Sequence, residues 1–337
     1  MISEIFIVSG FLGAGKTTLI QKLLQESFQK EKVALIENDF GEISVDAALL
    51  KSGNVEVREI NSGCICCSLS GDFVRALKKL LDRFHPDKII IEPSGVGKLS
   101  DIVKACTDPR IQPFAQVKTK ITVADVKRCK MYLKSFGEFF EDQIQNADVI
   151  LLSRTEDFPD QINDAYKLVK SVNAHSDILL KPWNQINAAE ILQPYDSPEL
   201  IEHCGHVGAD TCGQHTSHNH GENGHCCGCH DHDHRGDCKH HHTAEDIFDT
   251  VTIRTKRIFS IEDLKERILD MERKAKGTVL RAKGIVRSTG GYINLQYLPE
   301  DIRITECAVD GDMLCIIGRG LNRQELIDLF SGDQSRE

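Results

Sequence analysis

A glycine-rich turn close to the N-terminus constrains the fold more than any other feature. An apolar run, Ile5–Val8, is short enough for a buried strand, and a segment with apolar residues at helical spacing follows the turn. The turn itself, Gly10–Thr17, reads GFLGAGKT and fits the pattern G-x-x-x-x-G-K-[ST]. Its glycines let backbone N–H groups converge on phosphates at the N-terminus of a helix. The strand–turn–helix context therefore predicts a P-loop that binds a nucleoside triphosphate.

Two side chains of this turn have predicted roles at the phosphates. Lys16 is expected to reach the β and γ oxygens, and the Thr17 hydroxyl is expected to coordinate Mg²⁺. The predicted nucleotide-binding residues of the turn are Gly10, Gly13, Ala14, Gly15, Lys16, Thr17 and Thr18.

Further apolar runs alternate with helical patterns along the first half of the chain. They lie at 33–36, 89–91, 121–123 and 149–152, and a helical pattern covers 72–84. This alternation is typical of βαβ units, in which helices cover both faces of a mostly parallel sheet. We therefore predict an α/β fold, with a P-loop NTPase domain over residues 1–195.

Acidic residues follow two of these strands. The run that ends in Glu92 places a carboxylate where P-loop enzymes handle Mg²⁺ or its water, and Gly95 is positioned to approach the γ-phosphate. The stretch ENDFGE after the second strand lies where a loop can respond to the γ-phosphate. The predicted catalytic residues are Lys16, Glu92, Asp39 and Glu42. A solvated turn is the alternative for the acidic stretch.

Composition limits the partners and the compartment. The chain has 51 acidic and 41 basic residues and a formal net charge of −10, which disfavours nucleic acid as a main partner. Its N-terminus shows no basic leader, and no apolar run reaches the roughly 18 residues of a membrane span. We therefore expect a cytoplasmic protein without a membrane partner. In a reducing compartment, clustered thiols are metal ligands or reactive groups more often than disulfides.

Three of the 13 cysteines, Cys64, Cys66 and Cys67, lie together between two glycines. Thiolates select ions such as Zn²⁺ or Co²⁺, and an incomplete ligand set suits an ion that must later leave. Cys64 and Cys67 also have C-x-x-C spacing, so a redox pair is the competing hypothesis, and small apolar core residues are the third. The isolated cysteines are predicted to be ordinary core residues: Cys106, Cys129, Cys307 and Cys315.

Taken together, these motifs resemble those of the CobW-like metallochaperone GTPases. The resemblance rests on GFLGAGKTT, ENDFGE, GCICCSLSG, Glu92 with Gly95, and RAKG at 281–284. It covers residues 3–157 and, more weakly, 246–331. It implies that GTP and Mg²⁺ bind at the turn, with Thr17 and Glu92 on the Mg²⁺ side. It also implies slow hydrolysis coupled to delivery of a transition metal to a metal-requiring client protein. By the same resemblance the metal ligands are Cys64, Cys66, Cys67 and, in some relatives, the acid matching Glu37.

One segment departs from the usual pattern of guanine-specific P-loop proteins. Where these carry N-K-x-D, this chain has Ser153-Arg154-Thr155-Glu156. We predict that Ser153, Arg154 and Glu156 contact the nucleotide, Arg154 by stacking on the base and Glu156 through its carboxylate. GTP is the expected nucleotide, and ATP or relaxed specificity remains open.

A middle segment has a different composition. Twelve of the 14 histidines and six of the 13 cysteines lie between His203 and His242, with almost no apolar residues. We predict a disordered, metal-binding linker over 196–245. Its best candidate for a secondary metal site is His225, Cys226, Cys227, Cys229 and His230. The alternative is a solvated linker whose histidines are incidental.

The remaining residues, 246–337, predict a small α+β domain. Strand-like runs separated by glycines accompany two helical patterns, at 261–275 and 322–330, and favour an antiparallel sheet. The stretch 246–260 is expected to be a strand. By resemblance, this domain regulates the GTPase or contacts the client.

The sequence thus supports one main hypothesis and two alternatives. The first is a GTP hydrolase acting as a metallochaperone, with Zn²⁺ as the first metal and Co²⁺ as the second. In it, bound GTP orders the acidic loop against the thiols, so metal and nucleotide binding are coupled. The alternatives are a metal buffer or sensor acting through 203–242, and a GTPase subunit for cobalt insertion into corrinoids. A homodimer is also considered.

Overall fold

The computed structural model describes residues 2–37, 55–59, 71–192, 244–274 and 276–331. All of them belong to one compact unit, made of residues 1–194 and 242–337. The predicted linker as far as residue 243, the acidic residues Asp39 and Glu42, and the cysteines at 64–67 lie outside the described residues.

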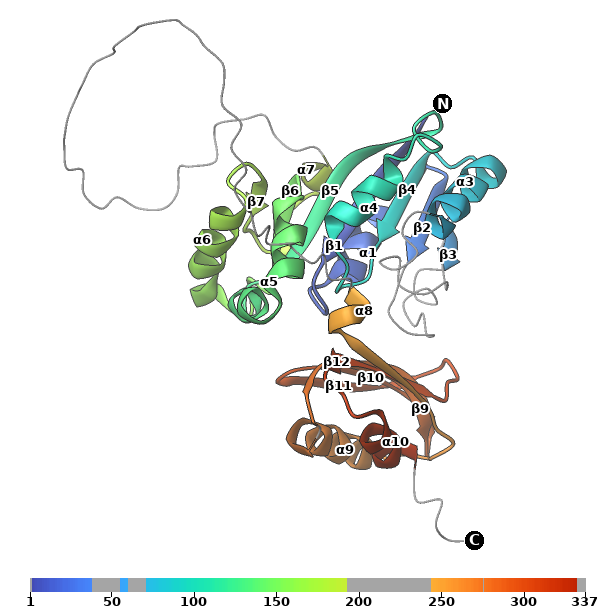
Figure 1. Cartoon of the computed structure of the whole chain (residues 1–337), viewed down its shortest axis with the longest axis vertical. Coiled ribbons are helices and arrows are strands. Elements are labelled where there is room, and N and C mark those ends of the chain that lie inside the picture. The colour runs from blue at the N-terminus through green and yellow to red at the C-terminus, as the bar shows by residue number, and fades with distance from the viewer. Residues whose placement is uncertain (1, 38–54, 60–70, 193–243, 275, 332–337) are drawn as a thin grey trace, which may run out of the picture. The chain divides into compact units, whose positions relative to one another are not determined.

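The first part of the chain forms a parallel sheet, as the alternating apolar runs predicted (Figure 1). In the described residues the strand order is β3-β2-β4-β1-β5-β6-β7, and every neighbouring pair is parallel. The strands are β1 (Ser3–Gly10), β2 (Val33–Glu37), β3 (Val55–Glu59), β4 (Lys88–Glu92), β5 (Ala115–Asp125), β6 (Val149–Ser153) and β7 (Asp177–Leu179). Parallel order places the carboxyl ends of β1, β2 and β4 at one edge of the sheet, where ligands bind in open α/β folds.

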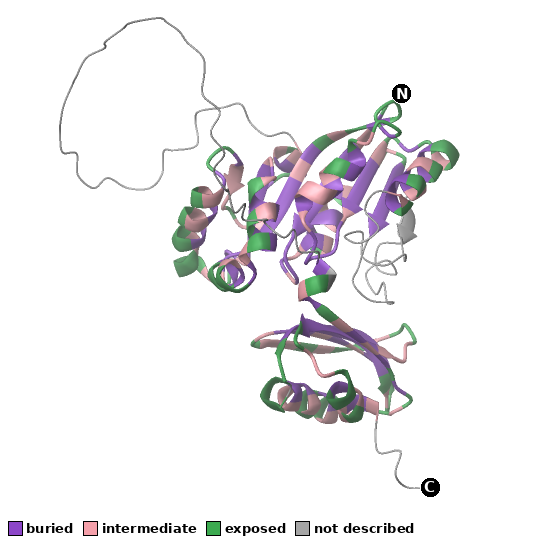
Figure 2. Ribbon diagram, viewed as in Figure 1, coloured by how far each residue is buried: buried purple, intermediate pink, exposed green. Residues whose placement is uncertain are grey.

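Helices lie on both faces of this sheet, whose strands are mostly buried (Figure 2). Alternate residues of the first strand belong to two separate cores. Ile5 and Ile7 of β1 belong to one core, together with residues of α3 (Asp72–Phe84), α4 (Leu99–Cys106), α5 (Cys129–Gln145) and α6 (Ile162–Val172). Phe6 and Val8 belong to the other, with α1 (Lys16–Glu26) and α7 (Ala188–Leu192). Burial on both faces explains why these strands are continuous apolar runs.

The last part of the chain forms an antiparallel sheet of strand order β11-β10-β9-β12-β8. Its strands are β8 (Asp249–Arg254), β9 (Thr278–Ser288), β10 (Gly291–Leu298), β11 (Asp301–Cys307) and β12 (Met313–Arg319). Two helices, α9 (Ile261–Lys274) and α10 (Arg323–Ser331), pack on one face. We refer to this part as the C-terminal sheet domain.

The opposite face of that sheet contributes to the first core. Leu280 of β9 and Cys315 and Ile317 of β12 are buried in the same apolar cluster as Phe11 and Leu12 of the glycine-rich turn. The C-terminal sheet domain therefore packs directly against the segment predicted to bind phosphate.

Three sequence predictions need correction here. Residues 244–247 form a short helix, α8 (Ala244–Ile247), so the last two residues of the predicted disordered linker are helical. The predicted strand over 246–260 is shorter than expected and covers only Asp249–Arg254. Phe248, just after this helix, packs against Phe11 and Phe136, and this tertiary contact outweighs the local strand preference. Of the four isolated cysteines, Cys307 is only half-buried, whereas the other three are buried as expected. None of the described helices is long and apolar enough to cross a membrane.

Candidate functional site

The glycine-rich turn joins β1 to α1, and three of its glycines have positive φ. The φ angles are 140° at Gly10, 70° at Gly13 and 110° at Gly15. Neighbouring atoms exclude a side chain as well, since a Cβ on Gly10 would lie 2.4 Å from the Val123 carbonyl oxygen. A Cβ on Gly13 would lie 2.2 Å from Leu298 of the C-terminal sheet domain. The turn thus needs glycine both for its backbone conformation and for close packing.

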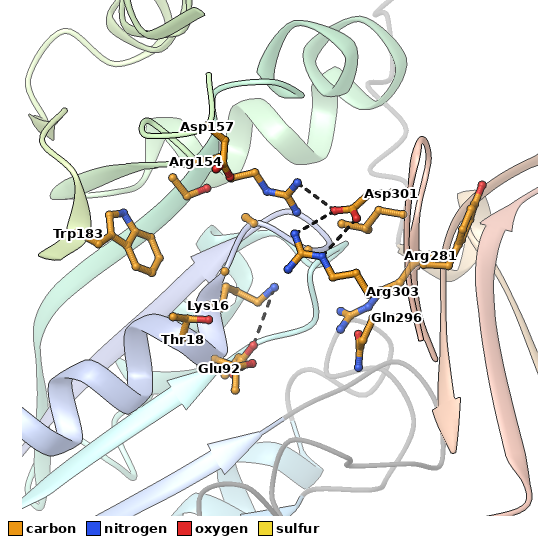
Figure 3. Close-up of a pocket in the computed structure, with 17 residues that line it drawn as sticks. Lys16, Thr18, Glu92, Arg154, Asp157, Trp183, Arg281, Gln296, Asp301 and Arg303 are labelled. Atoms are coloured by element: carbon orange, nitrogen blue, oxygen red, sulfur yellow. Dashed lines mark hydrogen bonds and ion pairs between the residues drawn. The ribbon is translucent and has the colours of Figure 1, made fainter. Parts of the chain in front are cut away.

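A cavity of about 400 Å³ opens above this turn (Figure 3). Its lining includes Glu92 and eight of the predicted nucleotide-binding residues: Gly13, Ala14, Gly15, Lys16, Thr17, Thr18, Ser153 and Arg154. Gly10, Gly95 and Glu156 are not part of the lining, and the carboxylate that lines the cavity after Arg154 is Asp157. The structure therefore brings the two distant predicted segments, the turn and the 153–157 loop, to one cavity.

Lys16, Thr17 and Glu92 lie in mutual contact at the floor of the cavity. The Lys16 Nζ donates to the Gly10 carbonyl oxygen at 3.0 Å and lies 4.0 Å from Glu92 Oε1. The Thr17 hydroxyl donates to Glu92 Oε2 at 3.5 Å. A hydroxyl beside a carboxylate is a hard oxygen donor pair, the ligand chemistry that Mg²⁺ prefers. The donor set therefore fits the predicted Mg²⁺.

Charged groups hold the 153–157 loop. Arg154 has a positive φ of 60°, and its Nε lies 3.3 Å from Asp125 Oδ2. Its Nη1 donates to Asp301 Oδ2 of β11 at 3.1 Å. Asp125 is buried and also accepts from Arg128 at 2.7 Å. Two carboxylates therefore fix the guanidinium that the sequence predicts to stack on the base.

Sequence reasoning missed a group of residues that complete the cavity. Trp183, in the short 3₁₀ helix Trp183–Gln185, donates its Nε1–H to the Leu152 carbonyl oxygen at 2.9 Å and lies beside Gly15. The remainder come from the C-terminal sheet domain: Arg281, Gln296, Tyr297, Leu298, Asp301 and Arg303. Only the RAKG motif, which contains Arg281, gave any signal of this in the sequence.

Glu37 is the predicted metal ligand that lies within the described residues. It lies next to Glu92, the carboxylate predicted to hold Mg²⁺. It is the last residue of β2, is buried, and stands opposite Glu92 of β4 in the parallel register. On its other side β3 ends at Glu59, opposite Glu37, five residues before Cys64 in the sequence. Within the described residues no three His, Cys, Asp or Glu side chains form a metal cluster. The predicted ligands Cys64, Cys66, Cys67, His225, Cys226, Cys227, Cys229 and His230 lie outside those residues.

The fold and this cavity define a P-loop nucleotide-binding protein. A family model described as CobW/HypB/UreG, nucleotide-binding domain, matches residues 4–179. The model of the cobalamin synthesis protein cobW C-terminal domain matches residues 248–332. Because the first match covers just over half of the chain, the chain belongs to the CobW/HypB/UreG family.

Individual relatives cover only part of the chain. The zinc chaperone YeiR of Escherichia coli (strain K12) is 33% identical over 150 residues, 44% of this chain and 46% of that protein. The zinc-regulated GTPase metalloprotein activator 1 of Dictyostelium discoideum is 25% identical over 242 residues, 59% and 50% respectively. The chain thus spans about half the length of these curated relatives. Among solved structures, the Zn(II)-bound YjiA GTPase of E. coli has a TM-score of 0.40 at 15% identity over 98% of each chain.

Proposed function

We propose that this chain is a GTP-dependent metallochaperone, which hydrolyses GTP and couples the nucleotide state to the capture and release of Zn²⁺ for a metal-requiring client protein. Family membership and the names of the relatives, zinc chaperones and a zinc-regulated GTPase activator, support the GTPase and the choice of metal. Co²⁺ is the second candidate metal, because thiolates accept both ions. We place this activity in the cytoplasm.

One observation carries the coupling. Glu92, on the Mg²⁺ side of the cavity, and Glu37, the predicted metal-side acid, are register partners on adjacent parallel strands. Neighbouring strands lie about 4.8 Å apart, so a shift of one strand end displaces the end of its neighbour. Binding of an ion at one of these carboxylates would therefore change the affinity for an ion at the other, and the effect is reciprocal.

The residues of the chain have distinct tasks in this mechanism. Lys16 holds the β and γ phosphate oxygens, and Arg154, fixed by Asp125 and Asp301, orients the base. Thr17 and Glu92 would hold Mg²⁺, which when bound neutralises charge on the phosphates. Glu37 and the thiols of Cys64, Cys66 and Cys67 would receive the transition metal, which is cargo. The acidic stretch with Asp39 and Glu42 lies in the sequence between Glu37 and Cys64 and would supply the predicted catalytic carboxylates.

The coupling is tested by titrating Zn²⁺ into the full chain with a non-hydrolysable GTP analogue and without nucleotide. We expect tighter Zn²⁺ binding with the analogue, by on the order of 10-fold or more, and loss of this gain in Cys66→Ser. Cys307→Ser is the matched control, because this half-buried thiol belongs to β11 and is not one of the predicted ligands. Equal Zn²⁺ affinity with and without nucleotide would overturn the coupling.

A second candidate function rests on composition. The density of His and Cys between His203 and His242 favours a metal buffer or sensor. Deleting 203–242 separates the two functions. Retention of one tight, nucleotide-dependent Zn²⁺ equivalent supports the chaperone, and loss of all metal binding supports the buffer.

A further inference from the structure

The RAKG motif at 281–284 lies in the middle of β9, and its side chains alternate between two environments. Ala282 and Val286 belong to the core beneath α9 and α10. Residues in a strand alternate faces, so Arg281 and Lys283 point the other way. Arg281 is half-buried and lines the nucleotide cavity, where it faces Lys16 and Glu92 (Figure 3). Gly284 permits a close approach, since a Cβ there would lie 2.1 Å from the Met313 carbonyl oxygen.

Packing shows that this face of the sheet lies over the phosphate-binding turn. Leu298 occupies the space next to Gly13. Ile317 and Cys315 of β12, the register partners of Arg281 and Lys283, are buried in the same apolar cluster as Phe11 and Leu12 of the turn. Lys283 is fully buried, and burial lowers its pKa to about 8; Cys315 and Glu37 act to raise it, and the charge of Lys16 acts to lower it. The side chains of Arg281 and Lys283 thus lie on the face of the sheet that packs against the turn.

The three arginines of the cavity differ in how they are held. Arg154 contacts Asp125 and Asp301, and Arg303, which is 65% exposed, contacts Asp301 at 3.3 Å. Arg281 has no carboxylate partner among the residues that the structure describes. A half-buried guanidinium that faces a phosphate-binding turn is suited to phosphate oxygens, which its planar fork of N–H donors matches.

We propose that Arg281 of the C-terminal sheet domain binds the phosphates of the nucleotide in cis and stabilises the charge that develops during hydrolysis. The inference rests on the proposed GTPase function and assigns it a catalytic residue from outside the nucleotide-binding domain. In the reaction, a water oxygen forms a bond to the γ-phosphorus while the bond between the γ-phosphorus and the β,γ-bridging oxygen breaks. The electron pair of that bond stays on GDP, and the water proton leaves with inorganic phosphate or to solvent. Arg281 keeps its protons and donates hydrogen bonds to the γ oxygens and the bridging oxygen.

The test compares steady-state GTP hydrolysis by the full chain and by Arg281→Ala, with Arg281→Lys as the conservative variant. We expect kcat to fall by on the order of 100-fold or more in Arg281→Ala. Lysine should restore part of the activity, because it keeps the charge but not the fork. Arg287→Ala is the matched control, since Arg287 belongs to the same strand, is exposed and does not line the cavity.

A binding measurement separates a catalytic role from a structural one. A catalytic Arg281 favours the transition state, so Arg281→Ala should weaken binding of GDP with aluminium fluoride much more than binding of GDP alone. Equal losses for both, in a variant with wild-type thermal unfolding, would overturn the proposal, as would a kcat equal to that of Arg287→Ala. If Arg281→Ala fails to fold, the same two measurements on Arg281→Lys decide. A wild-type chain that neither binds nor hydrolyses GTP would instead overturn the proposed function.

Discussion

The parallel sheet and the C-terminal sheet meet at one cavity, but they contribute to it in different ways. The parallel sheet supplies the backbone of the turn, with glycines at positive φ and the N-terminus of a helix. It also supplies Lys16, Thr17 and Glu92, which lie at the ends of a helix and a strand. The C-terminal sheet supplies side chains from the middle and ends of its strands, namely Arg281, Leu298 and Asp301. The contribution of the parallel sheet depends on local backbone geometry, so it can be recognised as a sequence motif. The contribution of the C-terminal sheet depends on how the two sheets pack, so its residues have no fixed spacing in the sequence.

The largest expected effect concerns the buried lysine of the C-terminal sheet. The pKa of Lys283 is lowered from 10.5 to about 8 by burial, so the folded chain binds fewer protons than the unfolded chain between these values. The Lys283 contribution to the free energy of unfolding therefore rises with pH from 8 to 10.5, by up to about 3 kcal/mol.

This is checked by urea unfolding of wild type and Lys283→Met across that pH range. The stability difference between the two proteins should shift in favour of wild type as pH rises. Lys276→Met, an exposed lysine just before β9, is the control and should show no such trend. A constant difference for Lys283→Met would mean that the lysine is not buried against the parallel sheet.

The contact between Gly13 and Leu298 gives an intermediate effect. Gly13→Ala forces alanine into a positive φ and against Leu298, and should lower the free energy of unfolding by about 2 kcal/mol. Combining it with Leu298→Ala should recover about half of this loss in a double-mutant cycle, because only the steric part is relieved. Strict additivity of the two changes would show that the C-terminal sheet does not lie on the turn.

The smallest expected effect concerns Asp301 of the C-terminal sheet. Its carboxylate contacts Arg154, which follows the parallel sheet's β6, and Arg303 of its own strand. Although partial burial acts to raise it, the pKa of Asp301 is held below its usual value of 3.8 by Arg303 and Arg154. Asp301→Asn should therefore cost about 1 kcal/mol at pH 7. The deficit should shrink as pH falls below 3.8, because there the carboxyl of the unfolded chain takes up its proton before that of the folded chain. Thermal unfolding at pH 7 and pH 3 measures this. An equal deficit at both pH values would assign the loss to packing.

Much of the fold could be predicted from the sequence, and the exceptions have physical causes. The pattern at 72–84 coincides with α3, because its apolar spacing is helical throughout. Two strands at the edges of the parallel sheet, β3 and β7, were not predicted. VEVRE alternates charged residues with valine, and DIL is only three residues long, so neither forms the continuous apolar run of a central strand.

The sequence by itself determined the phosphate-binding turn, since a strand, a glycine-rich loop and a helix N-terminus are specified by neighbouring residues and by the φ angles that only glycine adopts easily. It also determined the partition into a parallel and an antiparallel sheet through its apolar patterns. Only the tertiary structure decided what closes the cavity. Trp183 and Arg281 lie more than 160 positions from the turn, and no local rule relates their side chains to it. Their place depends on which faces of the two sheets pack together, and that is a property of the whole folded chain.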